Sequence, residues 1–532
     1  MDSVAHLGVA HYLKVNSHAF KNIITHRLST TYNSVAHLGV PHCHLASHFD
    51  PIHPYPTPLF YTPSTTHNSP KRFIPFCRYY IIKFEVNPAK LTFRLLLPFI
   101  FFFSTLQAQP RLDAYEDGVY REYIRSVRLH VNGLSLTQPI AALGQKNALF
   151  LTFDELDGRG TSYYYTVIHC DRHWQPTPEL TQFDYLNGFR EGEIREYDIS
   201  SGTNQDYLNY YLTIPNDEVK WSISGNYLLV VYESGYEDDP ILTRRFMVTE
   251  DRVKISSNVV RPAVVAQQNT HQEIDFGVET KDLNCSNPRA EFFCMVMQNG
   301  RWATRIEDIT PRTITGSYLD YNYQGKIAFE AGKEYRNMDI SSMIYRSEDV
   351  LDIQEYKEGF STILIPAEPR ARLSYIWRRD LNGMFVPYNR DYTRKHIPPD
   401  SLASTLNLVN RFNYREQYLN TDYSEVIVTL KMPEPLSTDV YVVGGITDWK
   451  MLPEYKLTYD ERVGGYVGRL YLKQGYYNYG FAIPDKNGNP DFAFLEGNWY
   501  TTENQYNLLA YYRPIGGQYD RLVGALTFDT YY

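Results

Sequence analysis

The chain has 532 residues, with 52 Lys and Arg against 61 Asp and Glu, which gives a net charge of −9 at pH 7. Residues 1–108 carry 9 of the basic and 3 of the acidic residues, so the remainder has 43 basic and 58 acidic residues and a net charge of −15. Nucleic-acid binding requires a positive face, so this balance argues against a nucleic-acid partner. Its 47 tyrosines favour strands over helices, and at about 100–200 residues per domain three domains are expected after residue 108.

Residues 1–89 form a leader of unusual composition. They hold ten of the 15 histidines and repeat the string SVAHLGV at 3–9 and 34–40. Neither helical nor strand periodicity is sustained. A metal site at the HCH string of 42–44 is one interpretation. The other, which we favour, is an upstream translated extension, produced by a start site placed too early, that is not part of the working protein.

Residues 90–108, KLTFRLLLPFIFFFSTLQA, have the pattern of a cleaved signal peptide. Lys90 and Arg94 form the basic region, 95–103 the apolar region, and Ala108 ends an acceptable cleavage site. A membrane-spanning helix needs about 20 apolar residues, which this run lacks, so we expect secretion and no membrane insertion by the chain itself.

Residues 109–250 are expected to form a first β-sandwich. Seven short strands in roughly 125 residues, separated by turn residues, are typical of that architecture. The alternating run at 124–131 ends at Asn132-Gly133, a hairpin signal. The clearest of the other expected strands lie at 148–153, 163–170, 207–215, 226–232 and 243–248.

The string HCDRHW at 169–174 is the most enzyme-like part of the chain. His169 and His173 are four residues apart, and an adjacent thiol at Cys170 could complete a metal-binding pair. However, neighbouring side chains on a strand point to opposite faces, so His169 and Cys170 diverge. We therefore expect a structural strand end, with an exported hydrolase using His169 or His173 as a hypothesis of lower rank.

Residues 251–370 are expected to form a second sandwich, with strands at 273–278, 291–298, 313–318 and 360–365. Cys285 and Cys294 could pair across a hairpin, which leaves Cys170 unpaired. Because exported domains held by disulfides carry more cysteines, the favoured alternative is three buried thiols. Residues 371–422 are less regular and are interpreted as a connector that packs on one neighbour.

Residues 423–532 are expected to form a third β-sandwich, with strands at 425–432, 439–443 and 476–483. The string GGITDW at 444–449, followed by aromatic residues, resembles the glycogen-binding β-sandwich modules found beside amylase-type enzymes. Those modules place aromatic rings against sugars. The resemblance implies Trp449, Tyr466 and Trp499 as candidate ligand or interface aromatics, although Trp449 could instead pack in the core.

No sequence signal indicates a catalytic residue, a cofactor or a metal site after residue 108. The chain has no P-loop, no GxGxxG turn and no HExxH string. The SGNY string at 224–227 lacks the second glycine of a nucleophile elbow and precedes a strand. The expected fold class is therefore all-β, with tandem immunoglobulin-like sandwiches.

A series of strings in a fixed order resembles one family, the plug protein of the type IX secretion system of Bacteroidetes. The resemblance runs from about residue 120 to the end. The strings lie at 168–174, 183–189, 214–216, 224–227, 243–248, 496–498, 502–506, 511–514 and 519–524.

This resemblance implies a periplasmic, non-enzymatic protein that associates with the inner side of the outer membrane. Its implied role is to bind and close the periplasmic opening of the outer-membrane translocon barrel. It implies no cofactor and no set of contact residues. The alternative is an exported carbohydrate-binding protein that uses the C-terminal module.

Overall fold

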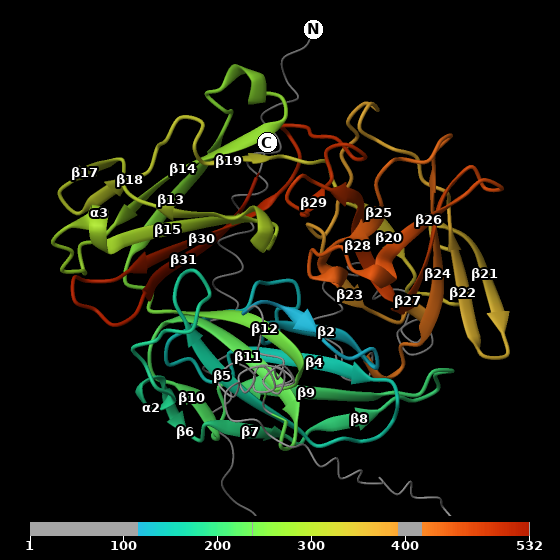
Figure 1. Ribbon diagram of the computed structural model, residues 1–532, viewed down its shortest axis with the longest axis horizontal. Helices are drawn as coiled ribbons and strands as arrows, with labels where there is room; N and C mark the ends of the chain where they lie inside the picture. Colours follow the sequence, from blue (N-terminus) through green and yellow to red (C-terminus); the bar gives the residue numbers. More distant parts are fainter. Residues whose placement is uncertain (1–114, 237, 392–417, 531–532) are drawn as a thin grey trace, which may run out of the picture. The chain divides into compact units, whose positions relative to one another are not determined.

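A computed structural model describes residues 115–236, 238–391 and 418–530 (Figure 1). The predicted leader, the predicted signal peptide, residues 109–114 and residues 392–417 of the predicted connector lie outside these ranges. The described chain is nearly all β, as the composition predicted. Its strands form three modules, each defined by its own hydrophobic core: the first module is residues 115–250, the second is 251–335 with 499–530, and the third is 336–391 with 418–498.

Two sheets form the first module. One has the order β1-β12-β11-β5-β7, with β3 parallel to β12, and the other has the order β2-β4-β9-β8. A small pair, β6 and β10, and the short helix α2 complete it. The bounds are β1 Gly118–Val119, β2 Ile124–Val131, β3 Ile140–Ala142, β4 Leu149–Glu155, β5 Tyr163–Cys170, α2 Gln182–Tyr185, β6 Leu186–Gly188, β7 Glu191–Ile194, β8 Tyr197–Ile199, β9 Leu208–Ile214, β10 Val219–Trp221, β11 Gly225–Glu233 and β12 Pro240–Thr249.

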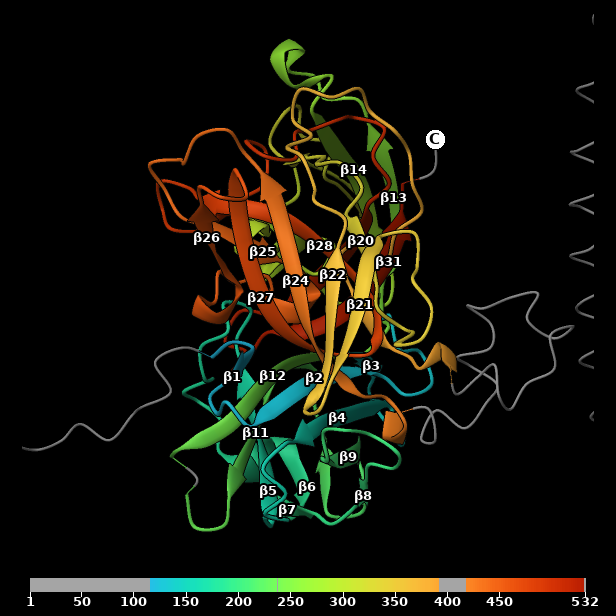
Figure 2. The ribbon, with the colours of Figure 1, turned by 90° about the vertical axis from the view of Figure 1, so that its right-hand side faces the viewer.

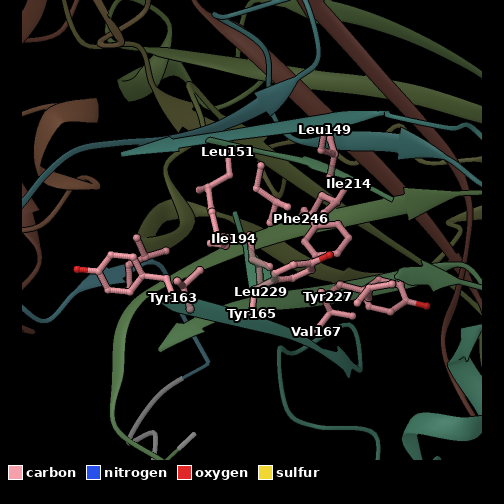
Figure 3. Packing of buried hydrophobic residues seen from close by; sticks show 14 of the residues in the cluster. Leu149, Leu151, Tyr163, Tyr165, Val167, Ile194, Ile214, Tyr227, Leu229 and Phe246 are labelled. Carbon is pink, nitrogen blue, oxygen red and sulfur yellow. The ribbon is translucent and has the colours of Figure 1, made fainter. Parts of the chain in front are cut away.

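Aromatic rings fill the space between these two sheets. Figure 3 shows Leu149 and Leu151 of β4 above Tyr165 of β5 and Tyr227 of β11. The hydroxyl of Tyr227 donates to the carbonyl of Ile223 at 2.9 Å, so its polar end is satisfied although the ring is fully buried. Burying a large apolar side chain contributes about 1.5–3 kcal/mol. Much of the tyrosine excess therefore serves the cores rather than the surface.

The second module is also a sandwich. One sheet has the order β13-β14-β18-β17, with β19 paired to β14, and the other has the order β16-β15-β30-β31. Its helical turns are η1 Val265–Gln267, α3 Pro288–Glu291 and η2 Trp302–Thr304. The strands are β13 Lys254–Val260, β14 His271–Glu279, β15 Phe292–Gln298, β16 Ile306–Ile309, β17 Thr313–Thr315, β18 Tyr318–Asp320, β19 Ala328–Glu330, β30 Gln505–Tyr512 and β31 Arg521–Asp529.

The third module contains one sheet path of the order β20-β28-β25-β26-β27-β24-β22-β21, with β23 and β29 added to β28. Figure 2 shows the hairpin of β21 and β22 beside β24, which β22 pairs in parallel. The bounds are β20 Arg336–Asp339, β21 Val350–Tyr356, β22 Gly359–Leu364, β23 Phe385–Pro387, β24 Tyr423–Lys431, β25 Val440–Val443, η4 Gly445–Thr447, η5 Pro453–Tyr455, β26 Lys456–Asp460, β27 Gly465–Lys473, β28 Gly475–Pro484 and β29 Pro490–Asp491.

The second and third modules are not contiguous in sequence, which differs from the predicted division at 370 and 423. The last two strands of the chain, β30 and β31, join the second module, where Phe292 of β15 lies opposite Tyr512 of β30. Conversely, β20, β21 and β22 precede residue 370 but contribute to the core of the third module. The physical reason is strand pairing over long sequence separations, which a division by chain order does not capture.

Two local predictions also differ from the structure. The turn at Asn132-Gly133 does not lead directly into the next strand, because an excursion that contains β3 precedes β4. The single strand predicted at 313–318 is a hairpin of β17 and β18, which turns at Gly316 with a φ of +61°. Glycine adopts this backbone conformation without a steric penalty.

Candidate functional site

The family-like strings at 168–174, 224–227, 511–514 and 519–524 meet at the boundary between the first and second modules. Asp171 follows β5 and its carboxylate accepts from the backbone N–H of His173 and Gln175, at 2.9 and 2.8 Å. This Asx-type turn fixes the chain after the strand. The string is therefore a structural strand end, as the sequence predicted.

Arg172, held by this turn, connects the two modules. Its Nε donates to Asp308 at 2.8 Å, and its backbone N–H donates to Asp520 at 3.0 Å. The guanidinium also lies 4.1 Å from the ring centroid of Phe293 on β15. Charge-assisted hydrogen bonds are stronger than neutral ones, and the Asp520 side chain is buried although Asp308 is exposed, so Arg172 ties the first module to two parts of the second.

His169 is buried beneath this turn, with both ring nitrogens engaged. Nδ1 lies 2.8 Å from the hydroxyl of Thr177, and Nε2 lies 3.2 Å from the carbonyl of Ser224. Burial lowers the pKa of His169 to about 4, because desolvation disfavours the charged ring. A histidine in this state has no nitrogen available for a metal or a substrate.

The neighbouring groups do not complete a catalytic arrangement around His169. Burial raises the pKa of the Cys170 thiol to about 12, which disfavours the nucleophilic thiolate. His173 lies at the surface, with Nε2 3.5 Å from Asp308 and Nδ1 3.9 Å from Glu307. Within the described ranges, no group of three or more His, Cys, Asp or Glu side chains could hold a metal ion.

A hydrophobic cluster between the first and second modules makes the boundary rigid. The central strand β11 is buried on both faces, since one face lines the core of the first module and the other packs toward the second module. Trp174 is 1% exposed and meets Trp302 edge to face at 4.9 Å. The members of this cluster are Cys170, Trp174, Leu228, Val230, Tyr232, Met247, Met295, Leu509, Tyr511 and Leu522. A boundary of this kind resembles a domain core, so the two modules act as one body.

The three aromatic residues predicted from the third unit do not come together. Trp449 is 8% exposed and packs against Tyr335, at 5.4 Å between ring centroids. Tyr466 is 4% exposed, and its hydroxyl accepts from the backbone N–H of Leu436. Trp499 is 44% exposed and stacks on Tyr375, at 5.7 Å. Of the three, Trp499 alone presents a substantial ring area to a partner.

Trp499 belongs to an exposed aromatic area that the sequence reading did not identify. We define the connector surface as Leu373, Tyr375, Ile376, Trp377 and Trp499. Ile376 is 73% and Trp377 is 58% exposed, and the Trp377 indole donates to Glu503 at 3.3 Å. Arginines at 372, 378 and 379 flank these rings and are also exposed. The signal for this surface was the mixture of Trp, Tyr and Arg within a stretch interpreted only as a connector.

The sequence left open whether Cys285 and Cys294 form a disulfide. Cys170, Cys285 and Cys294 are all free, so the alternative of a bond between Cys285 and Cys294 is not realised. Cys170 and Cys294 are buried, and Cys285 is half-buried beside Glu291, with its sulfur 3.5 Å from Oε2.

In the described part of the chain, no helix has the length and apolar character needed to cross a membrane.

Three β-sheet modules, joined by buried contacts and bearing an exposed aromatic surface, define a multi-module β protein. Residues 124–250 match the family described as the type 9 secretion system plug protein 1st domain. This match confirms, for residues 124–250, the resemblance to the plug protein of the type IX secretion system that the sequence predicted. The match of the first module indicates a role in type IX secretion.

One solved structure supports the fold of the described chain. A hypothetical protein from Parabacteroides merdae is 28% identical, and the alignment covers 78% of this chain and 100% of that chain, with a TM-score of 0.70. A native alpha-2-macroglobulin from Escherichia coli aligns over 38% of this chain and 92% of that chain at 9% identity; its TM-score of 0.16 carries no structural argument. No curated protein matches the chain in sequence.

Proposed function

We propose that this protein is a non-enzymatic plug in the periplasm, which binds and closes the periplasmic opening of the outer-membrane translocon of the type IX secretion system. The observation that carries the proposal is the family match of the first module. Its partner is the translocon barrel, through which the chain associates with the inner side of the outer membrane. The chain itself contributes obstruction and no bond-making chemistry.

The packing of the modules supports this role physically. A plug must resist deformation, and the cluster around β11 joins two modules through a hydrophobic boundary. The ion pair between Asp154 and Lys473 joins the first module to the third, with both side chains fully buried. Since relative motion would expose these groups to water, the modules are held as one stiff body.

The connector surface is the best candidate for the contact with the barrel. Binding that must be reversed favours an interface of modest size with a few aromatic anchors. Trp, Tyr and Arg dominate the energetics of such interfaces. Trp377 and Trp499 present exposed rings beside exposed arginines, and Trp499 is the predicted interface residue with the largest exposed fraction.

Copurification from native membranes tests the proposal. The tagged protein should come down with an outer-membrane translocon barrel that carries no transport cargo. Replacing both Trp377 and Trp499 with Ala should reduce the recovered barrel, whereas Tyr236→Ala, which removes an aromatic ring of 61% exposure from the first module, should not. The absence of any such complex in gentle detergent extracts would contradict the proposal.

A deletion strain provides the second test. If the protein obstructs a channel, a strain without it should take up more small solutes through its outer membrane than the parent strain. Restoring the gene should return uptake to the parental level. Equal uptake in the deletion and parent strains would argue against obstruction even if the complex forms.

Carbohydrate binding by the third module stays an alternative prediction with less support. Sugar stacking requires an accessible ring face, and the Trp449 ring is held between Tyr335 and Phe492, with Arg301 5.7 Å from its centroid. Calorimetric titration with soluble α-glucans tests this alternative. A flat titration would remove it, and binding that Trp449→Ala abolishes would support it.

A further inference from the structure

A cavity of about 570 Å³ lies between the first and third modules, and Lys473 of the buried ion pair with Asp154 forms part of its lining. Ligand-binding cavities commonly measure about 300–1,000 Å³ and are lined by apolar and aromatic groups with a few polar ones. The first module contributes residues 118–122, 124–127 and Arg244, and the third contributes residues 445–448, 450, 452–455 and 471–473. Its aromatic lining consists of Tyr120, Phe385, Tyr423, Tyr455, Tyr471 and Tyr477.

Arg125 on β2 faces this cavity without a partner. Its Nε atom is buried and has no hydrogen-bond partner among the described residues. Arg125 also forms no ion pair with a carboxylate of the described chain, whereas the other basic side chains of the cavity lining do. A buried donor left unpaired costs about 1–3 kcal/mol, and more when it is charged, so such a group calls for an explanation.

The backbone around Arg125 is irregular in a way that directs its side chain. The pairing of β2 with β4 shifts register between Arg125 and Arg128, which marks a bulge. Ser126, next in sequence, has a φ of +52°, an uncommon conformation for a residue other than glycine. Bulges re-aim side chains and are frequent beside functional sites. Here the bulge lies where Arg125 enters the cavity lining.

The other charges of the cavity lining are either paired or at the surface. Four cations have carboxylate partners: Arg121 with Asp239, Arg244 with Asp448, Lys450 with Glu116 and Lys473 with Asp154. Two lining carboxylates, Glu122 and Glu454, belong to exposed residues. Within the described lining, Arg125 therefore supplies positive charge that no ion pair neutralises.

Two tyrosines place apolar surface near the Arg125 charge. Burial raises the pKa of Tyr455 and of Tyr471, and in both cases the nearby positive charge of Arg125 opposes that rise. The guanidinium thus lies within electrostatic reach of both rings. Arg presents a planar fork that matches a carboxylate with two parallel hydrogen bonds. Rings beside the fork favour a ligand with an apolar or aromatic body.

We propose that this cavity binds a carboxylate carried next to an apolar or aromatic group, with the carboxylate on Arg125 and the apolar group against Tyr455 and Tyr471. The ligand is the end of a peptide or a free aromatic acid, which share this chemistry. Because both modules line the cavity, an occupant contacts them simultaneously and stabilises their arrangement. The inference is independent of the proposed plug function.

Titration of the purified protein with N-acetyl-L-phenylalanine and its neutral amide tests the proposal. By calorimetry or ligand-observed NMR, the carboxylate should bind about tenfold more tightly than the amide. Arg125→Gln should weaken carboxylate binding about tenfold. The matched control is Arg462→Gln, since Arg462 is 88% exposed and distant in sequence, and this variant should keep the wild-type affinity.

Equal binding of the carboxylate and the amide by the wild-type protein would overturn the proposal, as would the absence of binding by either. Unchanged affinity in a folded Arg125→Gln variant would also overturn it. If that variant fails to fold, the comparison of carboxylate with amide on the wild-type protein still decides. Acetyl-Ala-Ala-Phe and phenylacetate then distinguish the sources, since a peptide site binds the former more tightly and a site for a free acid binds the latter more tightly.

Discussion

Lys473 on β27 forms an ion pair with Asp154 on β4, at 2.7 Å between Nζ and Oδ2, although both side chains are fully buried. The two residues belong to different modules. Tyr423 and Asn209 donate to the two oxygens of Asp154, each at 2.7 Å. Burial lowers the pKa of Lys473, and the attraction of Asp154 opposes this shift. The pair satisfies two charges that neither module could bury alone.

Removing one partner of this pair should destabilise the protein strongly. Lys473→Met leaves the Asp154 carboxylate buried without its counter-ion, and such changes cost about 3–5 kcal/mol. Arg469 lies on β27, as Lys473 does, and forms an exposed ion pair with Glu425 of β24 at 2.8 Å. Arg469→Ala breaks this pair and should cost at most about 1 kcal/mol. Urea unfolding of the two variants measures the difference. Equal losses would mean that the buried pair does not hold the boundary.

Gly225 should not tolerate a side chain, because it closes over His169. Its φ is +137°, and a Cβ there would lie 2.5 Å from His169 Nε2 and 3.2 Å from the carbonyl of Asp520. Gly225→Ala should therefore cost about 2–5 kcal/mol, from backbone strain and overpacking together. Gly516→Ala is the control, since its φ of +81° imposes strain but nothing lies within 4 Å of the added carbon. If both variants lowered the melting temperature by the same amount, the overlap of the added carbon with His169 would contribute nothing to the loss at Gly225.

The strands of the first module were predictable because their signals are local. The observed β5, Tyr163–Cys170, has the predicted bounds, and the observed β4, β9, β11 and β12 begin or end within a few residues of the predicted ones. Apolar runs bounded by turn residues carry this information. The continuous apolar character of β11 also reflects burial on both faces, which the sequence indicated only as a strand.

The pairing of distant strands and the candidate site were less accessible from the sequence. Nothing in the Tyr-rich string at 505–512 says that it will lie beside β15 rather than β28, since either sheet could accept it. The sequence left both a surface and a core position open for Trp449. Its burial depends on Tyr335 and Phe492, which are far from it in sequence. Exposure depends on tertiary packing, and for this reason Trp377 was missed.

The two histidines of the 169–174 string should differ sharply in their effect on stability. His169→Ala leaves a cavity between Tyr227 and Tyr519, whose ring centroids lie 5.0 and 5.5 Å from the imidazole, and should cost about 2–4 kcal/mol. His173→Ala removes a partly exposed ring and should change stability by about 0.5 kcal/mol. Chemical denaturation measures both. A stable His169→Ala variant that loses a measurable hydrolytic activity would revive the hydrolase hypothesis.

Stability should fall as the pH drops below about 6.5, because two buried histidines resist protonation. Burial lowers the pKa of His169 to about 4 and that of His130 to about 3, with the charge of Arg128 adding to the effect at His130. In the unfolded chain both titrate near pH 6.5, so below that pH the unfolded state binds more protons. The stability is thus complete above about pH 7 and is lost progressively toward pH 4 and then pH 3.

His169→Gln isolates one contribution to this pH dependence. At about 1.4 kcal/mol per pH unit, the wild-type protein should lose up to about 3 kcal/mol through His169 between pH 6.5 and pH 4, and the variant should lack that loss. The stability advantage of the wild type over the variant should therefore shrink as the pH falls, since the carboxylates titrate in both proteins. Urea unfolding at pH 7, pH 5.5 and pH 4.5 measures it. A constant advantage across this range would show that His169 is protonated in the folded protein as readily as in the unfolded chain.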